Sequence, residues 1–174
     1  EAIAVQIAFR ELTGGHSRIA QLEPVGRHRP APRPPGADAD ADPDGEGGVR
    51  ATLVRYCPGG DADAAYDDRP ALVWVHGMTD YFFHKNAAKI FTAQGYAVYG
   101  LDLRKCGRSW REGQTWHHVS SQSLYGEDLT VAASLITKTH PNLVVLGHSN
   151  GGLGVTMWAV RLHRDAVDMP ESPQ

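Results

Sequence analysis

Residues 143–152 read Leu-Val-Val-Leu-Gly-His-Ser-Asn-Gly-Gly, and this stretch decides the fold. Its first four residues form an apolar run that is typical of a buried strand. The pattern Gly-x-Ser-x-Gly follows directly at 147–151, and a helical pattern runs from about 150 to 164. We therefore expect a strand, a tight turn and a helix in immediate succession, with Ser149 held above the edge of a sheet.

The glycines on either side of Ser149 have a steric purpose. A serine in such a turn takes a strained backbone conformation in which neighbouring side chains would collide, and Gly147 and Gly151 have none. The helix that follows directs its first N–H groups toward an oxyanion formed during attack. Ser149 is therefore the candidate nucleophile. His148 is expected to pack rather than to act as a base, because its side chain leaves the turn in another direction.

Apolar strands alternate with helices in the preceding part of the chain. We predict strands over 49–56, 71–75 and 96–101, and helices over 85–94 and 124–139. This alternation predicts an α/β protein with a parallel sheet that helices cover on both faces.

The first 48 residues differ in composition from the rest. Residues 1–24 form an N-terminal segment that we leave unassigned, with a strand or a short helix as options. Residues 25–48 are rich in Pro, Gly and Asp and predict a flexible linker. Within it, residues 40–45 resemble the first half of a calcium loop, but Ala51 stands where a glutamate is needed. A solvated acidic linker is the preferred interpretation.

A second motif, His76-Gly77-Met78-Thr79-Asp80, follows the strand predicted over 71–75. We expect the backbone N–H groups of Met78 and Asn150 to converge on one oxyanion, with a plain strand-ending turn as the alternative.

A third motif, Asp102-Leu103-Arg104-Lys105-Cys106-Gly107-Arg108-Ser109, follows the next strand. We expect its Asp102, Arg104 and Arg108 to stabilise the turn through salt bridges. Cys106 is expected to be buried, and a reactive thiolate beside these cations is the less favoured alternative.

The three motifs together resemble the α/β-hydrolase group that includes monoacylglycerol lipases, lysophospholipases and serine aminopeptidase-like proteins. Members commonly show His-Gly after one strand, Asp-x-x-Gly-x-Gly-x-Ser after the next and Gly-His-Ser-x-Gly-Gly at the nucleophile. The resemblance covers about 49–164, and Lys105-Cys106 stands where Gly-His is usual. It implies a partial α/β-hydrolase fold, with 49–174 as an incomplete domain whose later strands are missing. The supporting residues would be His76, Gly77, Gly147, His148 and Gly151.

The resemblance also implies a catalytic triad, in which Ser149 acts together with an acid and a histidine that lie after later strands. We expect both to be absent from this chain, because His163 lies roughly 20 Å along the helix from Ser149. His84, His117 and His118 stay open as weak alternatives. The strand over 143–146 would then have an unpaired edge, so we expect marginal stability or self-association.

Composition limits the partners that we expect. The net charge of −3 gives no reason to expect nucleic acid, and no apolar run is long enough for a transmembrane segment. We expect no cofactor and no metal, because neither metal-ligand spacing nor a phosphate-binding loop is evident. Two cysteines are too few for a disulfide framework, which favours reduced thiols and a cytoplasmic protein.

The leading hypothesis is the N-terminal part of a serine hydrolase that cleaves a lipid or small carboxylic ester through an acyl-enzyme. We expect the fragment itself to be inactive. One alternative is a non-catalytic, truncated relative that binds a ligand or a partner. Another is acyl transfer or peptide hydrolysis at the same site, because one scaffold hosts many reactions.

Overall fold

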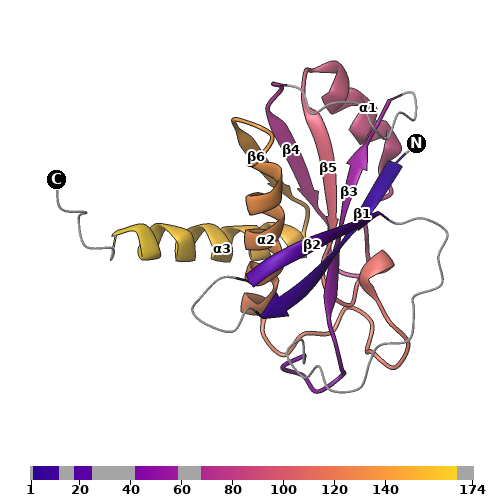
Figure 1. Ribbon diagram of the computed structural model, residues 1–174, viewed down its shortest axis with the longest axis vertical. Helices are drawn as coiled ribbons and strands as arrows, with labels where there is room; N and C mark the ends of the chain where they lie inside the picture. Colours follow the sequence, from indigo (N-terminus) through magenta and orange to yellow (C-terminus); the bar gives the residue numbers. More distant parts are fainter. Residues whose placement is uncertain (1, 12–17, 25–41, 59–67, 168–174) are drawn as a thin grey trace.

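A six-stranded sheet organises the computed structural model, which describes residues 2–11, 18–24, 42–58 and 68–167 (Figure 1). The strands follow the order β2-β1-β3-β5-β4-β6 across the sheet. Their bounds are β1 Ala2–Glu11, β2 Arg18–Pro24, β3 Arg50–Tyr56, β4 Ala71–Val75, β5 Ala97–Asp102 and β6 Leu143–Gly147. The helices are α1 Lys85–Ala93, α2 Tyr125–Ile136 and α3 Asn150–Val167, and short 3-10 turns occupy Gly107–Ser109 and Gln122–Leu124.

The sheet is parallel in one half and antiparallel in the other. β4 pairs in parallel with both β5 and β6, as the alternation of strands and helices predicts. β3 pairs with β5 in the antiparallel direction, and β1 is antiparallel to both β3 and β2. The prediction of a parallel sheet is therefore correct for three strands only. An apolar run shows that a strand is buried, but its direction depends on which neighbour it pairs with.

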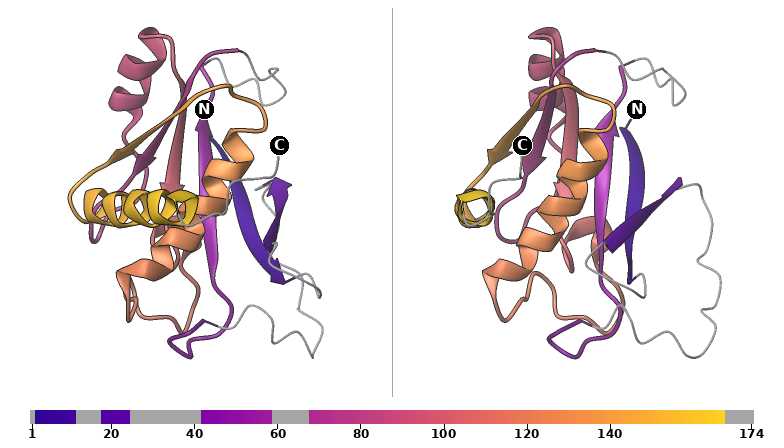
Figure 2. Two further views of the ribbon diagram at one scale, coloured as in Figure 1. Left: turned by 90° about the vertical axis from the view of Figure 1, so that its left-hand side faces the viewer. Right: turned by 60° about the vertical axis from the view of Figure 1, so that its left-hand side comes forward.

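Helices cover both faces of the sheet, as predicted. Successive side chains of β4 point to opposite faces: Val73 joins the core under α2 and α3, whereas Leu72 joins the core under α1. Ile136 of α2 and Ala88 of α1 are buried in these two cores. α3 starts at the sheet, contacts α2 and then extends away from both (Figure 1), and the right-hand view of Figure 2 looks along its axis.

The N-terminal part of the chain adds to the sheet. The unassigned segment 1–24 supplies β1 and β2, so a strand was the correct option of the two. Most of the linker predicted over 25–48 lies outside the described residues. Residues 42–48 are described, and they differ from the solvated acidic linker that we expected, because Asp42 is buried and is ion-paired to Lys105.

β6 forms the edge of the sheet within the described part of the chain. Val144 in this strand keeps 42 % of its side chain exposed, which agrees with the unpaired edge that the sequence predicts. None of the helices among the described residues combines the length and the apolar character needed to cross a membrane.

Candidate active site

Ser149 lies in the turn between β6 and α3, with φ at +53°. This left-handed conformation is uncommon for a residue with a side chain, and it is the strain that the sequence predicts at this position. Ser149 is also exposed, so its hydroxyl is accessible from outside.

The two flanking glycines are required by close backbone contacts. A Cβ on Gly147 would lie 2.6 Å from Cα of Gly152, and a Cβ on Gly151 would lie 2.3 Å from the carbonyl oxygen of His76. Real Cβ atoms do not approach other atoms this closely, so no larger residue fits without a shift of the backbone. Gly151 thereby lets the start of α3 lie directly against the end of β4.

The start of α3 is fixed by its own turn. The N–H of Gly151 donates to the carbonyl of His148 at 2.9 Å, and the N–H of Gly152 donates to that of Ser149 at 2.9 Å. The N–H of Asn150 comes one residue before these donors. Among the described residues, no acceptor takes a hydrogen bond from it or from the N–H of Met78. Both N–H groups thus remain available to a ligand, as an oxyanion hole requires.

The loop after β4 is attached to this turn. The N–H of His148 donates to the carbonyl of Val75 at 2.9 Å, which continues the pairing of β6 with β4. A Cβ on Gly77 would lie 3.2 Å from Cβ of Ser149, so the backbone of the loop runs close to the serine. The structure therefore brings the segment His76–Met78 and the segment Gly147–Gly151 together, as the spacing of the motifs predicts.

His76 is buried at the carboxyl end of β4, and its two ring nitrogens have different roles. The N–H of Leu103 donates to Nε2 at 3.1 Å, so Nε2 must be an acceptor and the ring proton lies on Nδ1. Nδ1 then donates to the carbonyl of Gly77 at 2.7 Å. Burial lowers the pKa of His76, which keeps the ring neutral near pH 7. His76 therefore connects the loop after β5 to the loop that carries Met78.

Salt bridges stabilise the turn after β5, as we expected from its charged residues. Asp102 is fully buried and accepts from the guanidinium of Arg108 at 2.8 Å and from the N–H of Phe82 at 2.8 Å. Arg104 is also buried, and its NH2 group lies 2.7 Å from Oδ1 of Asp128 on α2. Both arginines of this turn are thus paired with buried carboxylates.

Cys106 is a buried thiol and not a reactive thiolate. Its Sγ donates to the carbonyl of Arg104 at 3.3 Å, and burial raises its pKa to about 12. The negative charges of Asp128 and Asp102, which pair with the two arginines, also raise this pKa.

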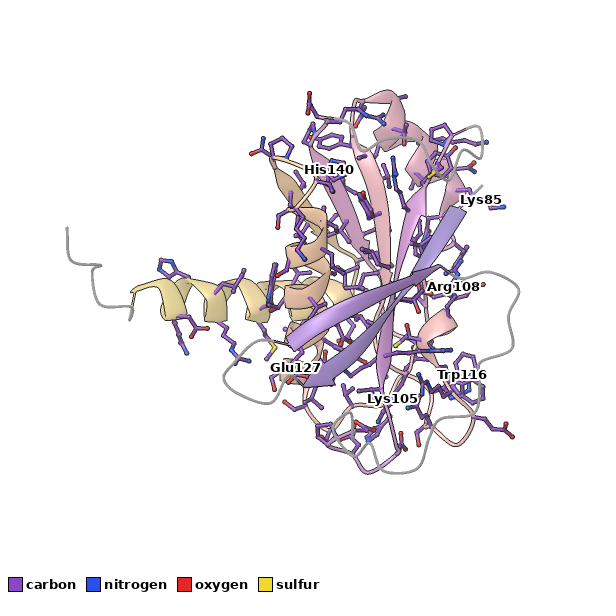
Figure 3. All side chains as sticks on the ribbon, viewed as in Figure 1. Lys85, Lys105, Arg108, Trp116, Glu127 and His140 are labelled. Atoms are coloured by element: carbon purple, nitrogen blue, oxygen red, sulfur yellow. The ribbon has the colours of Figure 1, made fainter. Side chains whose placement is uncertain are left out.

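No described histidine forms a hydrogen bond or an ion pair with Ser149. His148 is exposed, and its ring lies 6.2 Å from that of Trp74, centroid to centroid. His84 stacks on Phe83 at 4.4 Å, and the ring of His117 lies 6.5 Å from that of His76. The remaining histidines of the described segments are also placed elsewhere: His163 is exposed on α3, His118 lies in the loop before α2, and His140 binds the hydroxyl of Tyr99 at 2.9 Å near the amino ends of the parallel strands (Figure 3).

The comparisons with known proteins match the part of the chain that carries these motifs. The family described as serine aminopeptidase, S33, matches residues 67–169. A monoacylglycerol lipase from Mycolicibacterium smegmatis is 35 % identical over 112 residues, which cover 62 % of this chain and 36 % of the lipase. This chain thus spans about a third of that relative's length.

Solved structures are also similar to this chain. One of them is a mutant of the rice cell wall degrading esterase LipA from Xanthomonas oryzae, at 24 % identity and a TM-score of 0.39. The match covers 68 % of this chain and 35 % of the esterase.

Proposed function

Since this chain belongs to the serine aminopeptidase (S33) family of α/β-hydrolases, we propose that it carries the nucleophile part of an esterase or lipase site. The proposed substrate is a lipid or a small carboxylic ester. The name of the similar monoacylglycerol lipase supports this substrate class. The observation that carries the proposal is the strained, exposed Ser149 at the start of α3, in contact with the loop that precedes Met78.

The proposed reaction consists of acylation of Ser149 and hydrolysis of the resulting acyl-serine. Oγ of Ser149 attacks the ester carbonyl carbon while a base takes the hydroxyl proton, and the oxyanion accepts hydrogen bonds from the N–H groups of Met78 and Asn150. The intermediate then collapses, the C–O bond to the alcohol breaks, and the base returns the proton to the leaving alcohol. Water hydrolyses the acyl-serine in the same way and releases the acid.

The base and the carboxylate that orients it are proposed to come from the part of the relatives' length that this chain does not span. No described histidine forms a hydrogen bond or an ion pair with Ser149, and we therefore expect the chain by itself to be inactive. The same observation favours a second candidate, a non-catalytic, truncated relative that binds a ligand or a partner. Acyl transfer or peptide hydrolysis would use the same nucleophile with another acceptor or bond.

Labelling with a fluorophosphonate probe separates the first two candidates. We would apply the probe to this chain and to the longest product of the same reading frame, and locate the adduct by mass spectrometry. The proposal expects an adduct on Ser149 in the longer product, no adduct in Ser149→Ala, and an unchanged adduct in the control Ser134→Ala. An adduct that persists in Ser149→Ala would rule out this nucleophile. Absence of any adduct from the longer product would support the binding role.

Two finer points are also proposals. Self-association through the edge of β6 is supported by its exposed Val144. A cytoplasmic location is supported by the small number of cysteines, which are too few for a disulfide framework.

A further inference from the structure

Lys105 is fully buried, although lysine is among the residues that are least often found inside proteins. Its Nζ lies 3.0 Å from Oδ2 of Asp44 and 2.9 Å from Oε2 of Glu46. Asp42 is a third ion-pair partner and is itself only 4 % exposed. Figure 3 shows Lys105 at the end of the sheet where residues 42–48 turn. We call Asp42, Asp44 and Glu46 the acidic cradle.

The backbone of the acidic cradle is closed by its own hydrogen bonds. The N–H of Asp42 donates to the carbonyl of Gly47 at 2.7 Å, and the N–H of Gly45 donates to that of Asp42 at 2.8 Å. Gly45 and Gly47 have φ of +78° and +85°, which glycine adopts without strain. This tight turn directs every second side chain, three in all, toward one point.

Contacts with the loop after β5 hold the cradle in place and keep it charged. Asp44 accepts from the N–H of Ser120 at 3.2 Å, and Glu46 accepts from the hydroxyl of Thr115 at 2.5 Å. These hydrogen bonds lower the pKa of Asp44 and of Glu46 to about 2, so both are ionised at neutral pH. Burial opposes the charge of Lys105, but the hydrogen bonds that its ammonium donates to the three carboxylates raise its pKa above the usual range.

We infer that the acidic cradle is a binding site for a primary ammonium ion, which this chain fills with its own Lys105. An ammonium has three N–H donors, which match three carboxylates that converge on it. The buried Nζ of Lys105 occupies the point where the three carboxylates converge.

The cradle attaches the segment before β3 to the loop beside the candidate active site. The carbonyl of Lys105 accepts from the N–H of His117 at 3.1 Å, and the ring of His117 lies 6.5 Å from that of His76. Lys105 is therefore a positioning residue for this loop. The inference does not require Ser149 to be a nucleophile.

The test is chemical rescue of Lys105→Ala. This change removes three methylene groups and the ammonium, which together correspond to n-propylammonium. We expect Lys105→Ala to lower the melting temperature by several degrees, and n-propylammonium chloride to restore part of this loss in a saturable way. Tetramethylammonium chloride at equal ionic strength has no N–H donor, and n-propanol has no charge, so neither should restore it.

The control is Lys89→Ala, an exposed lysine on α1, which should change neither the melting temperature nor the response to the salts. A second change, Asp42→Asn in the Lys105→Ala background, should remove the rescue. If Lys105→Ala does not fold alone, its refolding yield from urea is compared in the two salts, and n-propylammonium should give the higher yield. Equal effects of n-propylammonium and tetramethylammonium on Lys105→Ala would overturn the inference, and so would an equal rescue without Asp42.

Discussion

A Cβ atom placed on Gly77 would lie 3.2 Å from Cβ of Ser149, so the end of β4 and the start of α3 meet at these two residues. They are far apart in the sequence, and the parallel pairing of β4 with β6 brings them together. A change of backbone or side chain on either side of this contact should therefore affect the whole candidate site.

Gly151→Ala should destabilise the fold. The new methyl group would lie 2.3 Å from the carbonyl oxygen of His76, and overpacking of this kind costs about 1–3 kcal/mol in the free energy of unfolding. Gly154→Ala is the matched control in the same helix, because nothing lies within 4 Å of its new Cβ. It should stabilise α3 by about 0.5–1 kcal/mol. Urea denaturation of both variants checks the difference. Similar free energies of unfolding for the two variants would contradict the close contact at Gly151.

Asp128→Asn should be among the most damaging single changes. It leaves the buried guanidinium of Arg104 without its main charge partner, which typically costs about 3–5 kcal/mol. Asp165→Asn is the control, since it breaks an exposed pair with Arg161 on α3 that is worth at most about 0.5 kcal/mol. Equal denaturation midpoints for the two variants would show that the Arg104 pair does not stabilise the turn.

The stability of the fold should fall in acid, because two carboxylates of the acidic cradle become protonated. The pKa values of Asp44 and Glu46 are about 2 in the fold, below the usual values of 3.8 and 4.5, so the unfolded chain binds protons first as the pH decreases. Their contribution is complete above about pH 5 and is lost as the pH falls toward 2. The Asp44→Asn, Glu46→Gln double variant should be less stable at pH 7 and should show a flatter decline between pH 5 and 2. If the free energy of unfolding of variant and wild type declined in parallel between pH 5 and 2, the prediction would be wrong.

Cys106 should resist alkylation in the folded chain. With its pKa raised to about 12, only about one thiol in 10⁴ is ionised at pH 8. We expect iodoacetamide to modify Cys106 only after the chain is unfolded in urea, with mass spectrometry used to locate the label. Rapid modification of Cys106 in the native chain would instead support a reactive thiol.

Self-association should depend on the edge of β6. Val144→Lys places a charge on this exposed strand and should reduce the oligomer fraction in sedimentation velocity at increasing concentration. Ile90→Lys, at a more exposed position on α1, is the control and should have no effect. A wild-type chain that stays monomeric over the whole concentration range would refute self-association through this edge.

Local patterns in the sequence predicted most elements of the fold to within a few residues. The strand Ala71–Val75 has the predicted bounds, because an apolar run between polar segments specifies its own ends. α2 was the least accurate: it ends at Ile136, before the predicted 139. The direction of β3 could not be predicted, because both directions bury the same apolar side chains.

The sequence by itself determined the turn at Ser149. Gly147, Ser149 and Gly151 lie within five residues, and the steric conflict that they avoid is local to the turn. The charged residues after β5 likewise indicated a salt-bridged turn, although they did not indicate which carboxylate pairs with Arg104.

Only the tertiary structure decided the roles of Lys105 and His76. The sequence showed Lys105 as a departure from a motif, and Asp42 and Asp44 as parts of a solvated linker, yet these residues form one buried ion cluster. The proton of His76 is likewise assigned by an N–H from the neighbouring strand end. Charge burial and tautomer depend on groups that the folded chain brings together from distant positions, and a linear pattern contains no information about such contacts.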